Sequence, residues 1–327
     1  MQLVDPYNRH LSYLRVSITD RCNLRCIYCV PPDGIPKLPH LEILRYEEIL
    51  RVIRVGVGMG ITKVRVTGGE PLVRQGVYDF LSELNRLAGV QDVSLTTNGV
   101  LLAPNIERLW QAGVRRLNIS LDTLSREKYR RITGADQFDT VWKGIKLALE
   151  AGFAPIKINA VALIGVNDDE LLDLARLSLS YPLHIRFIEF MPIGKSRLNT
   201  DQLLLTAEIK RRIGALGPLE PVPQGVLDGP ARRFRLVGAP GEIGFISALS
   251  HHFCRHCNRL RLTASGQLRP CLLADHHEDV KSALRRGCSD QELAAIFLAA
   301  VRHKPMDHCV AADHPNRVNG QMCSIGG

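Results

Sequence analysis

The segment Thr19-Asp20-Arg21-Cys22-Asn23-Leu24-Arg25-Cys26-Ile27-Tyr28-Cys29 places three cysteines on one short stretch with the spacing C-x3-C-x2-C. Thiolates are the ligands that iron–sulfur clusters and zinc prefer, so this loop can bring three sulfur ligands to one point. A structural zinc site normally needs a fourth Cys or His, and the local sequence offers no His at a suitable spacing. An open metal centre, with one position left for another molecule, is therefore favoured over a closed zinc site and over three unrelated buried thiols.

Around this segment, short β-rich runs alternate with helical stretches from Tyr13 to about Met191. This alternation is the pattern of parallel βα units, and the six units predict either an incomplete barrel or an open doubly wound sheet. A connecting region is expected from about Met191 to Ala239, because that stretch is rich in turn residues. The predicted strands are residues 13–19, 63–67, 92–96, 116–120, 156–161 and 185–190, and the predicted helices include residues 46–57, 77–87, 105–111, 140–151, 170–180, 206–213 and 290–301.

Five of the six predicted strands have one polar face. Side chains on a strand alternate between its two faces, and the interior of a packed barrel would be apolar. We therefore predict a polar, positively charged cavity lined by strands and suited to an anionic ligand; the alternative is a face exposed to solvent. The polar faces hold Arg15, Ser17 and Thr19; Lys63, Arg65 and Thr67; Ser94 and Thr96; Asn118 and Ser120; and Lys157 and Asn159, whereas the sixth strand breaks the pattern.

The second predicted strand is followed by Thr67-Gly68-Gly69-Glu70-Pro71. Paired glycines at a strand end let the backbone approach a ligand closely, and the adjacent carboxylate can accept a hydrogen bond from an ammonium group. On its own, this segment is equally consistent with a simple turn.

A second cysteine group, Cys254, Cys257 and Cys271, has the spacing C-x2-C-x13-C. Read alone, it favours a zinc ribbon, which together with the basic charge would make a nucleic-acid-binding module. A second open iron–sulfur cluster competes with that interpretation, and the presence of the first motif makes it the preferred one. A fourth zinc ligand could come from His252, His256, Cys288, Cys309 or Cys323.

Two further features of the C-terminal part are candidates for function. Arg259 and Arg261 lie on one face of a predicted strand beside the second cysteine group, where two guanidiniums can clamp a phosphate or carboxylate. A strand face exposed to solvent is the alternative. The chain ends in Gly326-Gly327, which could enter a narrow polar cavity, although most termini are functionless.

The composition is that of a globular protein: 327 residues, of which 45% are hydrophobic and 23% charged. The N-terminus lacks an apolar signal region and no run approaches the ~18 apolar residues of a membrane span, so we expect a cytoplasmic protein. Six of the nine cysteines fall in two tight groups, which indicates metal binding rather than disulfides. The formal charge of +9 indicates a polyanionic partner, either nucleic acid or a nucleoside triphosphate.

The first cysteine motif with Tyr28, followed by Gly68-Gly69-Glu70-Pro71, resembles the signature of the radical S-adenosylmethionine (SAM) enzymes. In that family three cysteines hold a [4Fe-4S] cluster and SAM chelates the fourth iron. With the second cysteine group and the Gly-Gly ending, the chain resembles the GTP 3′,8-cyclases of molybdenum cofactor biosynthesis over essentially its full length. This resemblance implies an α/β fold, in which residues 1–215 form an incomplete (β/α)6 TIM-type barrel. Residues 216–327 would form a smaller C-terminal α+β extension that carries a second cluster.

The resemblance also implies roles for individual residues. Cys22, Cys26 and Cys29 would hold the SAM cluster, and Cys254, Cys257 and Cys271 a second [4Fe-4S] cluster whose open iron faces guanine. Tyr28, Gly68, Gly69, Glu70, Ser120 and Met191 would bind SAM. Arg15, Arg65, Thr96, Lys157, Arg259, Leu260 and Arg261 would bind GTP. Arg259, Arg261, Gly326 and Gly327 would be needed for catalysis.

The family's reaction is that of a lyase. A 5′-deoxyadenosyl radical removes the C3′ hydrogen of GTP, the ribose radical attacks C8, and reduction gives (8S)-3′,8-cyclo-7,8-dihydroguanosine 5′-triphosphate. The implied partners are a flavodoxin- or ferredoxin-type electron donor and the next pathway enzyme, cyclic pyranopterin monophosphate synthase. A stable complex with nucleic acid or membrane is not implied, and the chain would be a monomer or homodimer.

Two alternatives remain from the residues alone. Another radical SAM enzyme with an auxiliary cluster, such as a peptide-modifying one, would share the first motif but would not need a cationic lining. A zinc-ribbon RNA-binding protein would use the second cysteine group and the positive charge. The sequence assigns no metal role to Cys288, Cys309 or Cys323.

Overall fold

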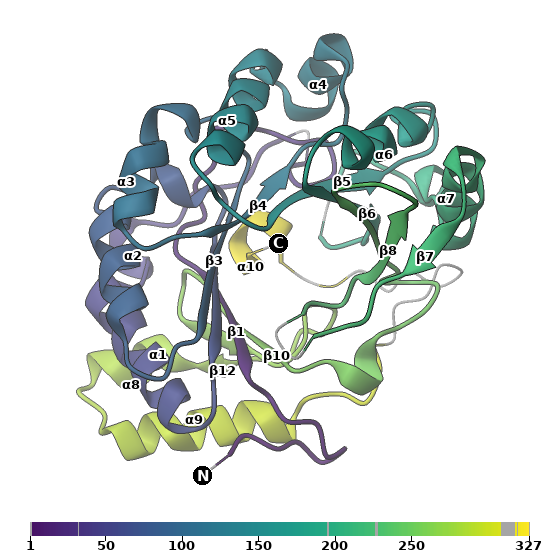
Figure 1. Cartoon of the computed structure of the whole chain (residues 1–327). Coiled ribbons are helices and arrows are strands. Elements are labelled where there is room, and N and C mark those ends of the chain that lie inside the picture. The colour runs from purple at the N-terminus through teal and green to yellow at the C-terminus, as the bar shows by residue number, and fades with distance from the viewer. Residues whose placement is uncertain are drawn as a thin grey trace.

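The computed structural model describes residues 2–31, 33–194, 196–225, 228–308, 318 and 320–326. Its centre is a curved twelve-stranded sheet that bends into an open ring, with β12 at one edge and β7 at the other (Figure 1). The six inner strands are parallel and follow chain order, as the alternating pattern predicts. They are β1 (Tyr13–Ser17), β2 (Lys63–Thr67), β3 (Asp92–Thr97), β4 (Arg116–Ser120), β5 (Ile156–Ala162) and β6 (Leu183–Glu189).

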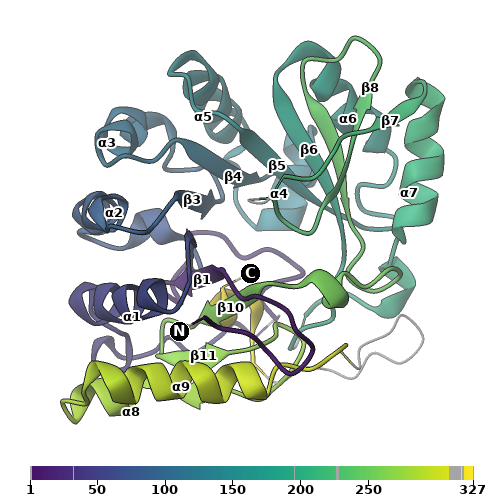
Figure 2. The ribbon, with the colours of Figure 1, turned by 60° about the horizontal axis from the view of Figure 1, so that its bottom comes forward.

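Helices cover the outer face of these strands, which confirms the incomplete barrel (Figures 1 and 2). The predicted helices all form, with bounds that differ from the prediction by at most two residues. One helix between β4 and β5, α4, was not predicted, because only three of its eight residues are buried. The outer helices are α1 (Tyr46–Gly58), α2 (Val77–Arg86), α3 (Ile106–Gln111), α4 (Arg126–Thr133), α5 (Phe138–Glu150) and α6 (Leu171–Ser180).

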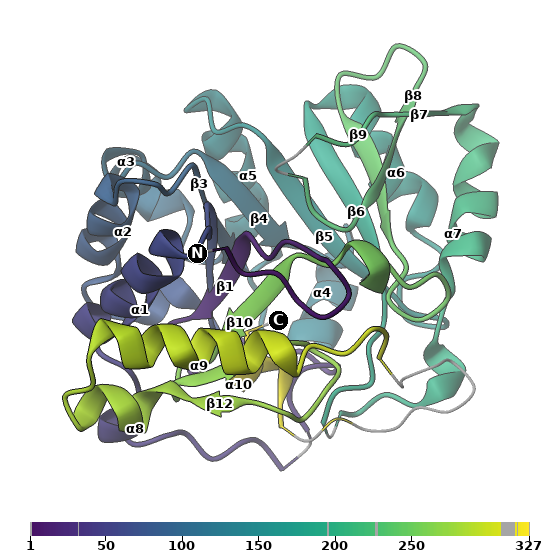
Figure 3. The same ribbon diagram turned by 90° about the horizontal axis from the view of Figure 1, so that it is seen from below.

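The C-terminal strands extend the ring from both sides. Strand β9 (Glu242–Ile246) pairs in parallel with β6, and β10 (Arg259–Leu262) pairs in parallel with β1 (Figure 3). Residues far apart in the sequence thus meet, because Arg15 of β1 lies beside Arg261 of β10. The remaining elements are α7 (Thr206–Ile213), β7 (Leu219–Pro221), β8 (Arg232–Leu236), β11 (Gln267–Arg269), β12 (Glu278–Asp279), α8 (Val280–Arg285), α9 (Asp290–Arg302) and α10 (Met322–Ile325).

The expected connecting region is only partly irregular. Besides α7 it contains β7 and β8, which pair antiparallel with each other and continue the sheet beyond β9. Both strands carry exposed residues and are flanked by prolines, so their sequence lacks the apolar alternation that would have identified them.

Alternation of side chains divides the sheet into an apolar outer face and a polar inner face. Val16, Val66 and Ile119 are fully buried in the core between strands and helices. The helices supply the other half of this core: α1 begins with a capping box between Arg45 and Glu48 and buries Ile53 against the sheet. Within the described ranges, none of the helices has the length and apolar character needed to span a bilayer.

Candidate active site

A cavity of about 210 Å³ lies inside the ring of strands. Side chains from the polar faces line it, and they include two arginines of the C-terminal strand β10. The predicted polar, cationic cavity is therefore confirmed. Arg259 and Arg261 also share one face of β10, because side chains two residues apart on a strand point the same way. The strand residues that line it include Arg15, Arg65, Thr96, Ser120, Asn159, Arg186, Arg259 and Arg261.

An adjoining cavity of about 560 Å³ holds the first cysteine group. Cys22, Cys26 and Cys29 line it together with Gly68 and Gly69, and the two cavities share walls formed by Tyr28, Thr96, Ser120 and Met322. The cysteine loop follows β1 and is fixed to the end of α4 by backbone hydrogen bonds, Arg25 to Thr133 at 2.8 Å and Ile27 to Ile132 at 2.9 Å.

The Gly68-Gly69 segment packs directly against the cysteine loop. The N–H of Gly69 donates to the carbonyl of Thr19 at 2.7 Å, and that of Glu70 to the carbonyl of Arg21 at 2.8 Å. A Cβ atom at Gly69 would lie 2.3 Å from the Arg21 oxygen, so this position requires glycine. The pair is therefore more than a simple turn: it joins the loops that follow β1 and β2 at the wall of one cavity.

Glu70 is fully buried and lines neither cavity. Its carboxylate accepts from the N–H of Leu72 at 3.0 Å, the hydroxyl of Thr97 at 2.8 Å and the N–H of Asn98 at 2.6 Å. Burial raises the pKa of this carboxyl to about 7, although the three donors oppose the shift. The contacts seen here tie the end of β2 to the end of β3; a contact between Glu70 and SAM stays a prediction.

Tyr28 is held by a residue that sequence reasoning missed. Its hydroxyl donates to Asp122 at 2.7 Å, and the other oxygen of Asp122 accepts from the N–H of Val161 at 2.8 Å. Burial raises the pKa of Asp122 to about 6. Asp122 stands two residues beyond β4, where the alternation of strand residues no longer identifies an inward side chain.

The second cysteine group lines the smaller cavity, so the two groups face adjoining cavities that share lining residues. Lys304 supports this group: its ammonium donates to the carbonyls of Pro270 at 2.6 Å and Arg259 at 2.8 Å, and lies 3.6 Å from Cys257 Sγ. Burial would raise the pKa of the Cys257 thiol, but Arg259 and Lys304 together lower it to about 6. A thiolate ready to bind a metal is thus favoured at Cys257.

Within the described part of the chain, neither cysteine group forms a closed site for a single ion. Among the described residues, neither set of three sulfur atoms lies entirely within 4.8 Å, the separation that would enclose one ion. His252 and His308 do lie that close to Cys254. This trio contains only one cysteine of the second group, Cys254. Cys309, another possible zinc ligand, lies outside the described residues.

The cationic wall of the cavity brings several buried guanidiniums close together. Burial and, to a smaller extent, neighbouring guanidiniums lower the pKa of Arg15, Arg186 and Arg261. Polar atoms are also left over, since Thr96 Oγ1, Asn159 Oδ1 and Arg186 Nε are buried with no hydrogen-bond partner among the described residues. These unpartnered atoms indicate a polar ligand, and the guanidiniums favour one with negative charge.

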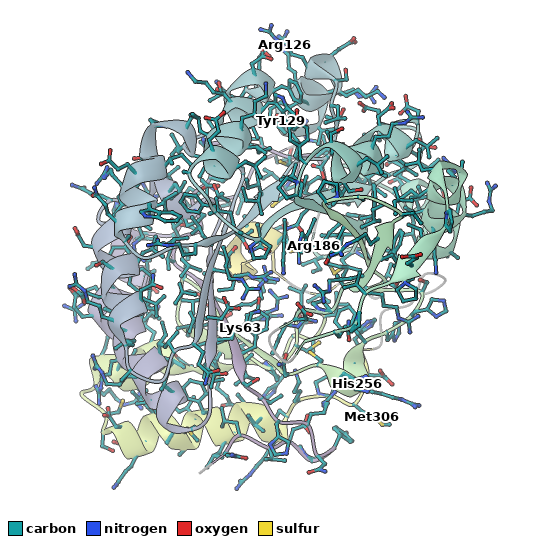
Figure 4. The ribbon with its side chains drawn as sticks, viewed as in Figure 1. Lys63, Arg126, Tyr129, Arg186, His256 and Met306 are labelled. Carbon is teal, nitrogen blue, oxygen red and sulfur yellow. The ribbon has the colours of Figure 1, made fainter. Side chains whose placement is uncertain are left out.

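Arg186 is the main cavity residue that the sequence did not identify. It comes from β6, the strand whose alternation appeared broken, because Ile188 follows it on the same face. The structure shows that β6 does contribute its inner face: Arg186 points into the ring and donates to Asn118 Oδ1 at 2.5 Å (Figure 4). The sixth strand does depart from the polar pattern, because Ile188 and Phe190 also face the cavity, but it still contributes Arg186.

Three other predicted site residues lie away from the main cavity or outside the description. Lys157 lines a small neighbouring pocket with His184 and Arg186. The side chain of Leu260 is fully buried in the outer core, opposite its neighbours in β10. Gly327 lies outside the described residues, whereas Met191 does line the cavity.

The C-terminal tail enters the ring of strands (Figure 1). Gly326 has a φ of +83°, and its carbonyl accepts from Arg261 at 2.7 Å. A Cβ atom here would lie 2.9 Å from both Ser17 Cβ and Thr67 Cγ2, so no larger residue fits without displacement. Gly326 thus lies in the interior of the ring, between β1, β2 and β10.

Comparison with known proteins agrees with this arrangement. The sequence profile of the Radical SAM superfamily matches residues 16–178, and the profile Molybdenum Cofactor Synthesis C matches residues 183–310. The crystal structure of Streptococcus suis SuiB bound to S-adenosylmethionine superposes with a TM-score of 0.61, covering 89% of this chain and 69% of that one. At 16% sequence identity this likeness concerns the fold.

Curated relatives match over nearly the whole length. The GTP 3′,8-cyclase of Moorella thermoacetica is 52% identical over 99% of both chains. That of Heliobacterium modesticaldum is 50% identical over 99% of this chain and all of the relative. The chain therefore belongs to the GTP 3′,8-cyclase family of radical SAM proteins.

Proposed function

We propose that this protein converts GTP to (8S)-3′,8-cyclo-7,8-dihydroguanosine 5′-triphosphate, the first step of molybdenum cofactor biosynthesis. Its cofactors are two [4Fe-4S] clusters and SAM. The observation that carries the proposal is the pair of three-cysteine groups that face two adjoining cavities, one of which has a cationic wall. Relatives named GTP 3′,8-cyclase, about half identical over the full length, support the same reaction.

The chain offers a fitting donor set at each end of this space. Cys22, Cys26 and Cys29 hold the first cluster beside Gly68 and Gly69, which leave room for SAM. Cys254, Cys257 and Cys271 hold the second. When bound, the first cluster with SAM supplies a carbon-centred radical able to take a hydrogen atom, and the second supplies an iron with an open position.

The protein's own part in the reaction is to position GTP. Arg15, Arg65, Arg186, Arg259 and Arg261 line the cavity and can neutralise the triphosphate through charge-assisted hydrogen bonds. The fold places these arginines close together before GTP binds, so the electrostatic environment for the triphosphate is already formed. A bound triphosphate then reduces the repulsion between their positive charges. The unpartnered atoms of Thr96 and Asn159 are suited to hydrogen-bond the polar groups of the nucleoside.

The tail completes the enclosure of the substrate. Gly326 is fixed by Arg261, one of the residues assigned to GTP, so the tail and the substrate share a contact. A closed cavity excludes water from the reactive carbon atoms, which limits side reactions. Gly327, the terminal residue, is assigned to the same role on the family resemblance.

Finer assignments follow from the reaction. The donor of electrons is a small acidic protein of the flavodoxin or ferredoxin type, which suits the net charge of +9, and the product passes to a cyclic pyranopterin monophosphate synthase. We place the enzyme in the cytoplasm, whose reducing conditions keep its thiols available for metal. Residues 1–215 would supply the radical-forming barrel and residues 216–327 the second cluster and the arginine clamp; the six strands β7–β12 all fall in the latter part.

The experiment is anaerobic incubation of the reconstituted protein with GTP, SAM and a strong reductant, followed by mass analysis. We expect 5′-deoxyadenosine together with a cyclised nucleotide, and about eight iron atoms per chain for two cubane clusters. Formation of 5′-deoxyadenosine without a GTP-derived product would point to another radical SAM reaction. Zinc in place of iron would support an RNA-binding module instead.

A further inference from the structure

Two imidazoles and a carboxylate converge at the surface, outside both cysteine groups. The ligand atoms of His276, Glu278 and His303 all lie within 4.8 Å of one another. His276 Nε2 lies 2.9 Å, and His303 Nδ1 3.3 Å, from the same oxygen of Glu278. None of the three residues is among those that line the two cavities of the active site. This histidine–glutamate trio is therefore a separate feature of the molecule.

The fold brings the trio together from two elements. Glu278 belongs to β12, where it pairs with Leu268 of the antiparallel strand β11. His303 is the residue at which α9 ends, and α9 runs alongside β12 (Figure 3). The ring centroids of His276 and His303 lie 4.0 Å apart as a result. The sheet edge and the helix end thus hold the three side chains at one point.

The spacing of the ligand atoms fits a zinc ion. Zinc binds histidine nitrogen and carboxylate oxygen at about 2.0–2.2 Å in a tetrahedron, which separates neighbouring ligand atoms by about 3.3 Å. The two separations from Glu278, 2.9 Å and 3.3 Å, are close to this value. Two imidazoles and one carboxylate also suit zinc better than magnesium or calcium, which prefer oxygen ligands. A fourth position is left for water.

One hydrogen bond must be exchanged for the ion to bind. His303 Nδ1 also lies 3.0 Å from the carbonyl of Ala299, and since a carbonyl only accepts, Nδ1 carries the proton there. Metal ligation at Nδ1 moves this proton to Nε2, and water can accept from it because the side chain is 55% exposed. The Ala299 carbonyl keeps the backbone N–H of His303 at 3.2 Å, so it stays hydrogen-bonded.

We propose that His276, Glu278 and His303 form a surface site for a divalent transition-metal ion of the zinc type. The bound ion fastens β12 to the end of α9. Lys304 directly follows His303 and donates to the carbonyls of Arg259 and Pro270 beside the second cysteine group, so the ion braces the support of that group. The proposal goes beyond the proposed function and holds whatever reaction the cysteine groups support.

The test uses the holoenzyme with both clusters loaded. The protein is incubated anaerobically with zinc chloride and desalted; its metals are then counted, and zinc X-ray absorption identifies the ligands. We expect about one zinc per chain in addition to about eight iron atoms. Its shell should contain nitrogen and oxygen at about 2.0–2.2 Å and no sulfur at about 2.3 Å. A sulfur shell would overturn the proposal, because it would place the zinc on the cysteines.

Variants assign the ion to the trio. His276→Ala and Glu278→Gln should lose the zinc and keep the iron, which also reports that the fold is intact. His277→Ala is the matched control, because this exposed neighbour bonds to the carbonyl of Asp275 and is not one of the trio. It should keep the zinc.

Three further results would overturn the proposal. Zinc retained by both trio variants, or lost equally from His277→Ala, would place the ion elsewhere. The absence of bound zinc from the unaltered holoenzyme would leave the trio as a hydrogen-bonded surface cluster only. Failure of the proposed function is distinguishable, because zinc would bind to the trio although no cyclised nucleotide formed.

Discussion

The guanidinium of Arg261 donates a hydrogen bond of 2.7 Å to the carbonyl oxygen of Gly326, and so joins strand β10 to the C-terminal tail inside the ring of strands. The tail is therefore part of the wall of the site. Gly326 is constrained by the side chains of β1 and β2 against which it lies.

Gly326→Ala tests the docking of the tail. The added Cβ would lie 2.9 Å from Ser17 and Thr67, and alanine is strained at a φ of +83°, so the tail must move. We expect product formation to fall by about tenfold or more, as misplaced groups lose catalytic positioning. Gly238→Ala is the control, because Gly238 has a φ of +75° but no atom within 4 Å of its added Cβ. It should cost about 1 kcal/mol of unfolding free energy and leave turnover intact; equal turnover in both variants would argue against a docked tail.

Arg186→Gln tests the cationic wall. Loss of a buried guanidinium removes a charge-assisted contact to the triphosphate, worth about 1.5–3 kcal/mol, so GTP should bind about ten- to a hundredfold more weakly by calorimetry. The ligand-free protein should be no less stable in thermal unfolding, because repulsion with Arg15 and Arg65 is relieved.

Arg235→Gln provides the comparison for Arg186. Arg235 is about half exposed and pairs with Glu242 outside the cavity, so GTP affinity should stay at the wild-type value. If Arg186→Gln and Arg235→Gln lowered affinity equally, the effect would be one of net charge rather than of position.

GTP affinity should fall as the pH rises above about 7. Burial, with Arg186 and Arg65 adding to it, lowers the pKa of Lys157 to about 7 in the ligand-free protein. A bound triphosphate would raise the pKa of Lys157 again, so above pH 7 the complex holds more protons than the free protein. Between the pKa of the free protein and that of the complex, GTP affinity therefore drops by at most about tenfold per pH unit. Calorimetry in buffers of different ionisation enthalpy should detect proton uptake at pH 8, and Lys157→Met should abolish it. Proton uptake that persisted in the variant would assign it to another group.

Lys304→Met should weaken the second cluster selectively. Lys304 donates to the carbonyls of Arg259 and Pro270 and lowers the pKa of Cys257, so its loss removes both a positional and an electrostatic support. We expect iron content to decrease from about eight toward about four per chain, with 5′-deoxyadenosine still formed. Lys210→Met, at an exposed lysine over the Phe234 ring, should retain the full iron content. Loss of the first cluster instead would contradict the assignment.

Much of the fold follows from local sequence. Strand β2 ends where its alternation ends, and the polar faces of β1 to β5 predicted the cavity because strand periodicity is enforced by the backbone. The pairing of β10 with β1 could not be read in this way. It depends on contacts between residues almost 250 positions apart, which no periodicity encodes.

The same distinction holds for the site. The cysteines and glycines were visible because their spacing is local, whereas Lys304 and Asp122 act through partners distant in sequence. Arg186 was missed for a different reason: two apolar residues on its face, Ile188 and Phe190, masked the alternation. Both kinds of omission concern residues whose role is set by tertiary packing rather than by local pattern.

The most direct measurement uses GTP carrying deuterium at C3′, incubated anaerobically with the reconstituted protein, SAM and reductant. Mass analysis of the 5′-deoxyadenosine then reports whether hydrogen leaves the nucleotide held by the arginine wall for the radical made beside Cys22, Cys26 and Cys29. We predict one deuterium in 5′-deoxyadenosine and its loss from the cyclised product. Unlabelled 5′-deoxyadenosine alongside unchanged GTP would contradict a single space shared by the two cysteine groups and the substrate.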